Sequence, residues 1–111
     1  MNDYVFAPPE RVSVKVLETN KRFAVNRVFC VGRNYAEHAI EMGFHPNRDK
    51  PFYFIKSPSA VIASGSTICY PEATDNFHHE IELVIAIGYG GSKILPDRAL
   101  SHIFGYACGL D

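Results

Sequence analysis

Three carboxylates are the side chains best placed to do chemistry. Glu80 and Glu82 open the apolar run "EIELVIAIG", residues 80–88, and Asp111 closes a second apolar run. Side chains alternate between the faces of a strand, so Glu80 and Glu82 share a face, about 7 Å apart at ~3.3 Å per residue. Like charges near a core repel and lose hydration, and a hard cation such as Mg²⁺ or Mn²⁺ relieves both costs. The spacing alone equally fits an exposed strand end with solvated glutamates.

Asp111 follows a strand in which one face is built largely from small residues. The alternate positions of this face are Ile103, Gly105, Ala107 and Gly109. A surface with so little bulk permits close approach of a ligand or of another backbone. A third carboxylate beside it suits a metal site. The alternative is a Gly-rich strand pressed against a neighbouring element, and the sequence fits it equally well.

A histidine and a glutamate form a second candidate group. His38 and Glu41 lie three residues apart in "NYAEHAIEMG", an expected short helix with Asn34 as its cap and Gly43 as its stop. Glu41 can orient the imidazole and stabilise its protonated form, which makes His38 a candidate general base for a water molecule. The same pair is also typical of ordinary neighbours on a helix surface.

Two other groups of residues carry less information. His78 and His79 precede Glu80, but HHExE lacks the HExxH spacing that places two imidazoles on one helix face, so we expect no zinc site. Lys56 ends the run "FYFIK". Its ammonium group can meet a substrate carboxylate, or it can simply reach water from a strand end.

The elements that would position these residues are mostly strands. We expect strands at residues 11–16, 22–32, 52–55, 68–71, 80–87 and from 103 onward, and helical segments at residues 34–43 and from Pro96. The first two form a hairpin that leads into a more buried strand. No strand alternates with a long helix, so the expected fold class is α+β, mostly β, and not a doubly wound parallel sheet.

Composition restricts the partners and the compartment. The net charge is −1, with no basic stripe for nucleic acid. No apolar run approaches the ~20 residues of a membrane span, and the start lacks an export signal, so we expect a cytoplasmic protein without membrane contact. Cys30, Cys69 and Cys108 show no CxxC spacing, and we interpret them as reduced core thiols.

Four ordered blocks resemble the fumarylacetoacetate hydrolase family. They are "VFCVGRNYAEHAIEMG", "PFYFIKSPSAVI", "HHEIELVIAIG" and "GYACGLD". The resemblance implies a mixed β-roll or sandwich with short helices. Residues 1–26 would form an N-terminal β-hairpin segment, and residues 27–111 the N-terminal part of the catalytic domain. Members of the family are longer, and the chain stops in an apolar strand, so we expect a truncated fold.

The resemblance also implies an activity. The family's E-x-E pair and later Asp, which hold Mg²⁺ or Mn²⁺, fall on Glu80, Glu82 and Asp111. The expected reaction is hydrolysis of a C–C bond in an acylpyruvate-type 2,4-dioxo acid, most like the fumarylpyruvate of gentisate degradation, with release of pyruvate and a carboxylic acid. Alternatives are an oxaloacetate decarboxylase, a 2-oxo acid isomerase, or a non-catalytic fragment that acts through an oligomer interface.

Four further residue roles and an assembly follow from the resemblance alone. The family's water-activating pair falls on His38 and Glu41. Arg33 and Lys56 fall where the carboxylates of a small 2-oxo acid substrate would bind. A homodimer is the expected assembly.

Overall fold

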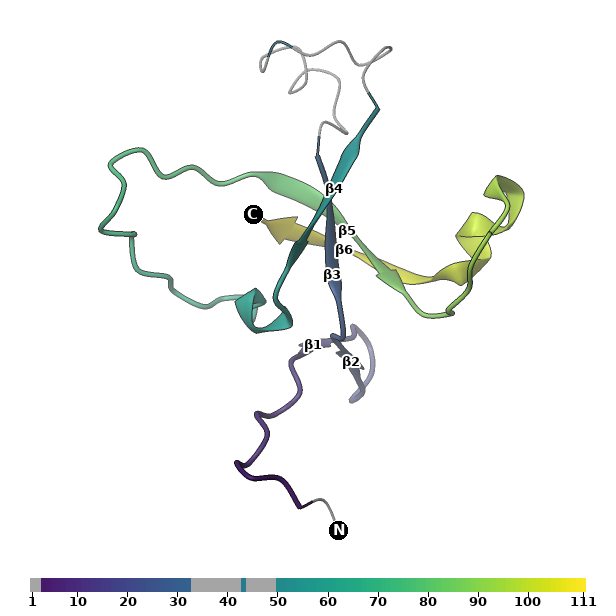
Figure 1. Ribbon diagram of the computed structural model, residues 1–111, viewed down its shortest axis with the longest axis horizontal. Coiled ribbons are helices and arrows are strands. Elements are labelled where there is room, and N and C mark those ends of the chain that lie inside the picture. The colour runs from purple at the N-terminus through teal and green to yellow at the C-terminus, as the bar shows by residue number, and fades with distance from the viewer. Residues whose placement is uncertain (1–2, 33–42, 44–49) are drawn as a thin grey trace. The chain divides into compact units, whose positions relative to one another are not determined.

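The structure is a computed structural model, which describes residues 3–32, 43 and 50–111. Its elements are β1 (Ser13–Lys15), β2 (Arg22–Ala24), β3 (Val28–Gly32), β4 (Phe52–Lys56), η1 (Pro58–Ala60), β5 (Ile81–Ile87), η2 (Pro96–His102) and β6 (Ile103–Leu110). The two η elements are 3-10 helices, and the fold is mostly β, as the sequence predicts (Figure 1). None of the described helices is long and apolar enough to cross a membrane. By its contacts the chain divides into two units, residues 1–67 and 68–111.

The first unit begins with the predicted hairpin. β1 and β2 pair antiparallel, with Ser13 opposite Ala24. Arg22 ties the two strands together, because its Nε donates to Ser13 Oγ at 2.7 Å and its Nη2 donates to the Ser13 carbonyl at 2.8 Å. The chain then leaves this sheet at residues 25–27 and enters β3. The predicted run of residues 22–32 is therefore two strands of separate sheets.

The second hairpin of this unit pairs β3 with β4, antiparallel from Val28–Lys56 to Gly32–Phe52. Phe52 and Phe54 are two residues apart on one strand face, and their ring centroids lie 5.9 Å apart. The Phe52 ring also lies where a side chain at position 32 would project, so the glycine makes room for it. Just before β3, the Arg27 guanidinium carbon lies 5.7 Å from the centroid of the ring of Phe29 in β3.

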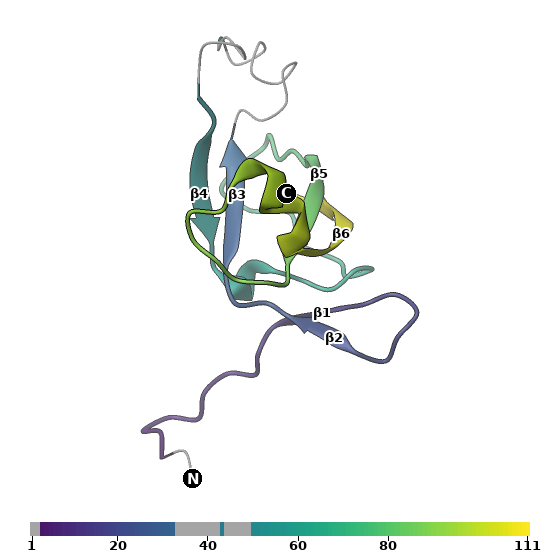
Figure 2. The same ribbon diagram turned by 90° about the vertical axis from the view of Figure 1, so that its right-hand side faces the viewer.

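The second unit is built on the β5–β6 hairpin, whose strands run side by side in both ribbon views (Figures 1 and 2). Both strands lie where the sequence predicts them. The ladder is continuous from Ile81–Leu110 to Ala86–Gly105 and then shifts, since Ile87 pairs with Ile103 and leaves Phe104 as a β-bulge. Gly88 accommodates the bulge, because a Cβ at this position would lie 2.8 Å from the Phe104 Cβ.

The predicted strand at residues 68–71 is wrong. This segment has no strand pairing in the structure, and Pro71 has no N–H to donate to a ladder. An aromatic contact organises the loop instead. The Tyr70 hydroxyl accepts a hydrogen bond from the Phe77 N–H at 3.0 Å, and the two rings meet edge to face with centroids 5.5 Å apart.

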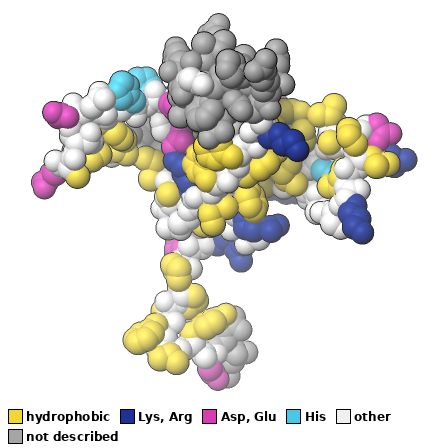
Figure 3. Space-filling model, turned by 45° about the horizontal axis from the view of Figure 1, so that its top comes forward, with side chains coloured by type: hydrophobic (Ala, Val, Ile, Leu, Met, Phe, Trp, Pro, Cys, Tyr) yellow, Lys and Arg dark blue, Asp and Glu magenta, His cyan; other side chains and the backbone are white. Residues whose placement is uncertain are grey.

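The predictions of a core beside the strand at residues 80–87 and of core thiols are also wrong for the described part of this chain. No residue in the described ranges is buried, and hydrophobic side chains are plainly visible on the surface (Figure 3). Cys69 and Cys108 are exposed, Cys30 is half-buried, and none of the three is in a disulfide. The physical reason is that the described sheets have only two strands each, and a sheet needs a covering layer to bury a face.

The predicted helix at residues 34–43 lies outside the described residues, apart from Gly43. This glycine has a φ of 82°. Positive φ is the left-handed region that glycine adopts without steric cost, which is the property expected of a helix stop.

Candidate metal centre

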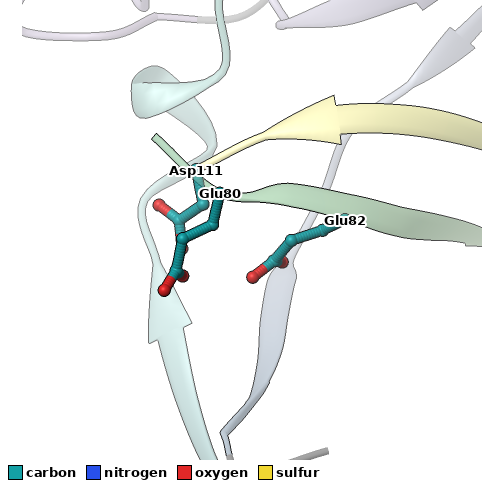
Figure 4. A group of neighbouring side chains, drawn as sticks. All are labelled: Glu80, Glu82 and Asp111. Atoms are coloured by element: carbon teal, nitrogen blue, oxygen red, sulfur yellow. The ribbon is translucent and has the colours of Figure 1, made fainter. Parts of the chain in front are cut away.

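The three carboxylates that the sequence singles out converge at one end of the β5–β6 hairpin. Glu80, Glu82 and Asp111 each offer one carboxylate oxygen, and these oxygens all lie within 4.8 Å of one another. Figure 4 shows the three side chains projecting to the same side of the two strands, Glu80 and Asp111 next to each other and Glu82 one step further along β5. Glu80 and Asp111 are exposed, and Glu82 is half-buried.

The register of the hairpin explains this convergence. Glu80 and Asp111 exchange both backbone hydrogen bonds, from Glu80 N to Asp111 O at 2.8 Å and from Asp111 N to Glu80 O at 2.9 Å. They extend the ladder by one pair beyond Ile81–Leu110, and residues of such a pair have their side chains on the same face. Glu82 lies on that face too, two residues along β5.

A glycine opposite Glu82 keeps this face open. Glu82 pairs with Gly109, which contributes no side chain between the carboxylates. A Cβ at position 109 would lie 2.7 Å from Val84 Cγ2, so the Val84 side chain occupies the space above this glycine. The small residues predicted on one face of residues 103–109 therefore allow β6 to pair closely with β5. This is the alternative of a Gly-rich strand pressed against a neighbouring element. The same small residues also leave the carboxylates uncovered.

The donor set fits a hard divalent cation. Carboxylate oxygens are the ligands that Mg²⁺, Mn²⁺ and Ca²⁺ prefer, whereas zinc and copper favour nitrogen and sulfur. Around Mg²⁺, oxygens at ~2.1 Å on opposite sides of the ion are about 4.2 Å apart. The three oxygens lie within 4.8 Å of one another, so they would have to draw closer together to bind one ion. Three negative charges at this distance repel each other, and a bound cation would turn that repulsion into attraction.

The neighbouring histidines do not join this cluster. Among the described residues, the three carboxylates are the one group of His, Cys, Asp or Glu side chains close enough together to share an ion. His78 is turned toward its own loop, where its Nε2 lies 2.7 Å from Asn76 Oδ1.

Of the other predicted site residues, the structure describes only Lys56. Lys56 is half-buried at the end of β4, opposite Val28, and belongs to the first unit. Arg33, His38 and Glu41 lie outside the described residues. The structure thus brings together the three predicted metal ligands and leaves the predicted catalytic pair and substrate contacts as predictions.

The direct pairing of Glu80 with Asp111 is a feature that sequence reasoning missed. The local pattern puts Asp111 at the end of a strand but identifies no partner strand for it. The available signal is the turn-forming segment between two apolar runs, "GYGGSKILPDRALSH", which is typical of a connection between antiparallel neighbours. Pairing the runs from that turn outward brings residue 80 opposite residue 111 once Phe104 is left unpaired as the β-bulge.

Comparisons with known proteins place the chain in a family. The sequence model described as "Fumarylacetoacetate (FAA) hydrolase C-terminal" matches residues 27–111. A fumarylpyruvate hydrolase from a Ralstonia species is 49% identical over 63 residues, which are 57% of this chain and 33% of that protein. The mitochondrial oxaloacetate tautomerase FAHD1 of Arabidopsis thaliana is 40% identical over 85 residues, which are 77% of this chain and 38% of that protein.

A solved structure gives a match over nearly the whole chain. The crystal structure of fumarylpyruvate hydrolase from Pseudomonas aeruginosa, in complex with Mn²⁺ and pyruvate, superimposes with a TM-score of 0.90 at 51% identity. The match covers 98% of this chain and 48% of the solved one, so the chain spans about half the length of that relative. With a matching family model over residues 27–111, the chain belongs to the fumarylacetoacetate hydrolase family.

Proposed function

We propose that the chain provides the metal-binding part of an enzyme that hydrolyses a C–C bond in a fumarylpyruvate-like 2,4-dioxo acid. The products are pyruvate and a carboxylic acid. The observation that carries the proposal is the convergence of Glu80, Glu82 and Asp111 on one face of a hairpin, with oxygens within 4.8 Å. The relative from Pseudomonas aeruginosa, described with Mn²⁺ and pyruvate, supports both the ion and the product.

Glu80, Glu82 and Asp111 would hold the ion, which is Mn²⁺ or Mg²⁺ in this proposal. A bound dication supplies a Lewis acid that stabilises negative charge on the oxygens of a 2-oxo acid. The paired backbones of Glu80 and Asp111 fix two of the carboxylates relative to each other, since both backbone hydrogen bonds between them are formed. Glu82, the least exposed of the three, adds its carboxylate from the next position on the same face.

The remaining roles rest on the family resemblance of the sequence. His38 would take a proton from a water molecule, which attacks the 4-oxo carbon, and Glu41 would stabilise the imidazolium that forms. The bond between carbons 3 and 4 then breaks, carbon 4 leaves as the carboxylic acid, and carbon 3 takes up a proton to give pyruvate. Arg33 and Lys56 would bind the substrate carboxylates, Arg33 through its planar fork of donors.

A second function in the same family also has support. Three of the similar proteins, from Arabidopsis thaliana, Caenorhabditis elegans and Bacillus subtilis, are oxaloacetate tautomerases that are 37–40% identical to this chain. Tautomerisation of oxaloacetate also develops enolate charge on a 2-oxo acid, so the same three carboxylates would serve it. The predicted isomerase alternative therefore stands as the second candidate.

The deciding experiment offers fumarylpyruvate and oxaloacetate side by side to the protein that carries these 111 residues, with Mn²⁺ present. We expect pyruvate release from fumarylpyruvate, measured with lactate dehydrogenase and NADH, and a rate that falls at least ~100-fold in Glu82→Gln. Keto–enol conversion of oxaloacetate, followed by its ultraviolet absorbance, reports the second candidate.

Two outcomes would count against the leading proposal. Turnover of oxaloacetate without hydrolysis of fumarylpyruvate would favour the tautomerase. Hydrolysis that is unchanged in Glu82→Gln, or that persists after EDTA treatment and gel filtration, would contradict a role for this cation site. The matched control is Glu72→Gln, which makes the same change of charge at an exposed loop position outside the cluster.

A further inference from the structure

A cavity of about 640 Å³ lies in the first unit, lined by the N-terminal segment and by the residues that follow β4. This volume is in the range of pockets that bind small molecules. The polar groups on its wall include a guanidinium, an amide, a phenol and two hydroxyls, which belong to Arg11, Asn26, Tyr4, Ser57 and Ser59. All five groups can donate hydrogen bonds, so the wall is suited to an acceptor such as a carboxylate.

The register of the first hairpin brings Arg11 to this cavity. The Val25 N–H donates to the Val12 carbonyl at 2.8 Å, so the pairing of β1 with β2 continues one step beyond the two strands. In the same register Arg11 lies opposite Asn26, at the open end of the hairpin. The chain then runs from Asn26 directly into β3, and both residues line the cavity.

The opposite wall begins at the residue after Lys56, the last residue of β4. Ser57 is the N-cap of η1, and its Oγ accepts the Ser59 N–H at 3.3 Å and lies 2.7 Å from Ser59 Oγ. One hydroxyl hydrogen is used between the two serine oxygens. The other hydroxyl hydrogen can therefore be donated to a ligand.

Two charged side chains line the cavity, Arg11 and Glu10, and both are exposed. Within the described ranges, Arg11 forms no side-chain hydrogen bond or ion pair. A guanidinium can bind a carboxylate through two parallel N–H···O hydrogen bonds, which a single ammonium group cannot reproduce. Arg11 is thus the group on this wall best suited to an anionic ligand, and Glu10 opposes it.

The segment that carries Arg11 lies outside the part of the chain that the family model matches. That model covers residues 27–111. The solved fumarylpyruvate hydrolase from Pseudomonas aeruginosa and a second solved structure, from Burkholderia cenocepacia, match 98% and 99% of the chain, so these matches include nearly all of residues 1–26. A segment outside the family-wide match is a place where substrate preference can be set without a change in the metal site.

We propose that this cavity binds the carboxylate at the acyl end of a fumarylpyruvate-like substrate, and that Arg11 selects for that carboxylate. The assignment rests on the proposed function, in which the metal ion holds the 2-oxo acid end of the substrate and Lys56 meets a substrate carboxylate. The cavity begins at the next residue, so the acyl end of a substrate that extends beyond the lysine would enter it. An uncharged acyl group would gain nothing from Arg11.

The test compares two 2,4-dioxo acids that differ in the acyl group, with the protein that carries these 111 residues and with Mn²⁺ present. Fumarylpyruvate has a carboxylate at its acyl end, whereas acetylpyruvate has a methyl group. Arg11→Gln should raise the KM for fumarylpyruvate at least ~10-fold with little change in kcat, because the lost contact is equally strong in the ground and transition states. Both constants should stay unchanged for acetylpyruvate, which also shows that the variant folds.

Two further variants give effects of different sign and size. Glu10→Gln removes the negative charge from the wall, so it should lower the KM for fumarylpyruvate. Ser59→Ala removes one hydroxyl and keeps the backbone hydrogen bond to Ser57, so it should raise this KM roughly 2–12-fold. Arg98→Gln is the matched control, since it makes the same substitution at an exposed arginine of the second unit.

The possible failures are distinguishable. Hydrolysis of fumarylpyruvate with an unchanged KM in Arg11→Gln would overturn the role of the cavity and leave the proposed function standing. A rise in KM that is equal for both substrates would do the same, because it would not depend on the acyl carboxylate. Turnover of acetylpyruvate or oxaloacetate without any hydrolysis of fumarylpyruvate by the unsubstituted protein would overturn the proposed function, and the role of the cavity with it.

Discussion

The β3–β4 and β5–β6 hairpins are built alike but end differently. Both are antiparallel, and both have apolar strands. In the β3–β4 hairpin, Gly32 lies opposite Phe52 at the end next to the connecting segment, and the aromatic ring occupies the space above the glycine. In the β5–β6 hairpin, Glu80 lies opposite Asp111 at the open end, away from the connecting segment, and like charges directly opposite each other destabilise a strand pair. One hairpin end is therefore arranged for packing, and the other accepts a cost that a bound cation would offset.

The largest effect is expected when one of the three carboxylates is removed from the open end of the β5–β6 hairpin. We expect Glu82→Gln to weaken Mn²⁺ binding by more than ~100-fold, because the loss of a direct ligand exceeds the 10–100-fold effect of an outer-shell partner. Electron paramagnetic resonance of free Mn²⁺ during titration measures the affinity. Glu72→Gln should leave it nearly unchanged, and an equal loss in both variants would show that only the net charge matters.

Metal binding should also stiffen this end of the hairpin. The amides of Glu80 and Asp111 close the last pair of the ladder, and an ion held by both side chains would link the two strands there. At a Mn²⁺ concentration of 100 times its Kd, binding can stabilise the closed pair by up to about 2.7 kcal/mol, or about 100-fold in amide exchange. Hydrogen exchange measures the effect, and magnesium can replace manganese where paramagnetism interferes.

The β1–β2 hairpin provides the internal reference for this experiment. The amide of Val25 donates to the Val12 carbonyl at 2.8 Å, and no carboxylate cluster lies in that hairpin. Its exchange should not respond to the metal. Equal slowing of exchange at Val25 and at Glu80 and Asp111 would mean that the ion acts on the whole chain and not on the acidic end of β5–β6.

In the β3–β4 hairpin, the position most sensitive to substitution is Gly32, on which the Phe52 ring packs. A methyl group there would overlap the Phe52 ring, and overpacking of this kind typically costs about 1–3 kcal/mol. We expect Gly32→Ala to accelerate amide exchange in β3 and β4 by roughly 5–150-fold, with little change in Mn²⁺ affinity. Gly105→Ala is the control, since a methyl group added to this glycine of β6 would project into open space, with no atom beyond its chain neighbours within 4 Å.

A second substitution shows whether the ring causes the effect. In a Phe52→Ala background the overlap disappears, so Gly32→Ala should have almost no further effect on exchange. If the two substitutions destabilise the hairpin additively, the glycine is needed for its backbone conformation and not to make room for the Phe52 ring.

The smallest effect is expected in the loop that precedes the acidic end. Tyr70→Phe removes the hydroxyl that accepts the Phe77 N–H and keeps the edge-to-face ring contact. The loss of one exposed hydrogen bond costs about 0.5–1.5 kcal/mol, which corresponds to roughly 2–12-fold faster exchange at Phe77. An unchanged rate would mean that the ring contact alone holds the loop.

The sequence predicts the strands of this chain better than their surroundings. The segments around Ile81 and Ile103 are recognisable because apolar, β-branched residues recur between turn-forming residues, which is a local property. Burial is a property of the neighbouring layers, so the apolar run of β5 predicts a buried strand although its side chains are exposed. The prediction for "ICYP" fails for a related reason, because Tyr70 makes a contact with Phe77 that strand propensity does not describe.

In the candidate site, too, the sequence predicts what depends on neighbouring residues and not what depends on distant segments. Strand alternation is sufficient to place Glu80 and Glu82 on one face, because that requires only neighbouring residues. The position of Asp111 depends on pairing two segments that are about 30 residues apart in the sequence, and a small error in register would move it. The family resemblance supplies that long-range relation, which the local pattern does not contain.

The β-bulge at Phe104 has a consequence for how this protein can change during evolution. It sets the alignment of β6 against β5 within the hairpin itself, six residues before Leu110. Insertions or deletions in the connecting segment of residues 88–102 can then be absorbed without moving the Asp111 side chain to the hydrophobic face of the hairpin. A gain or loss of one residue between Phe104 and Asp111, in contrast, would invert that side chain and separate it from both glutamates.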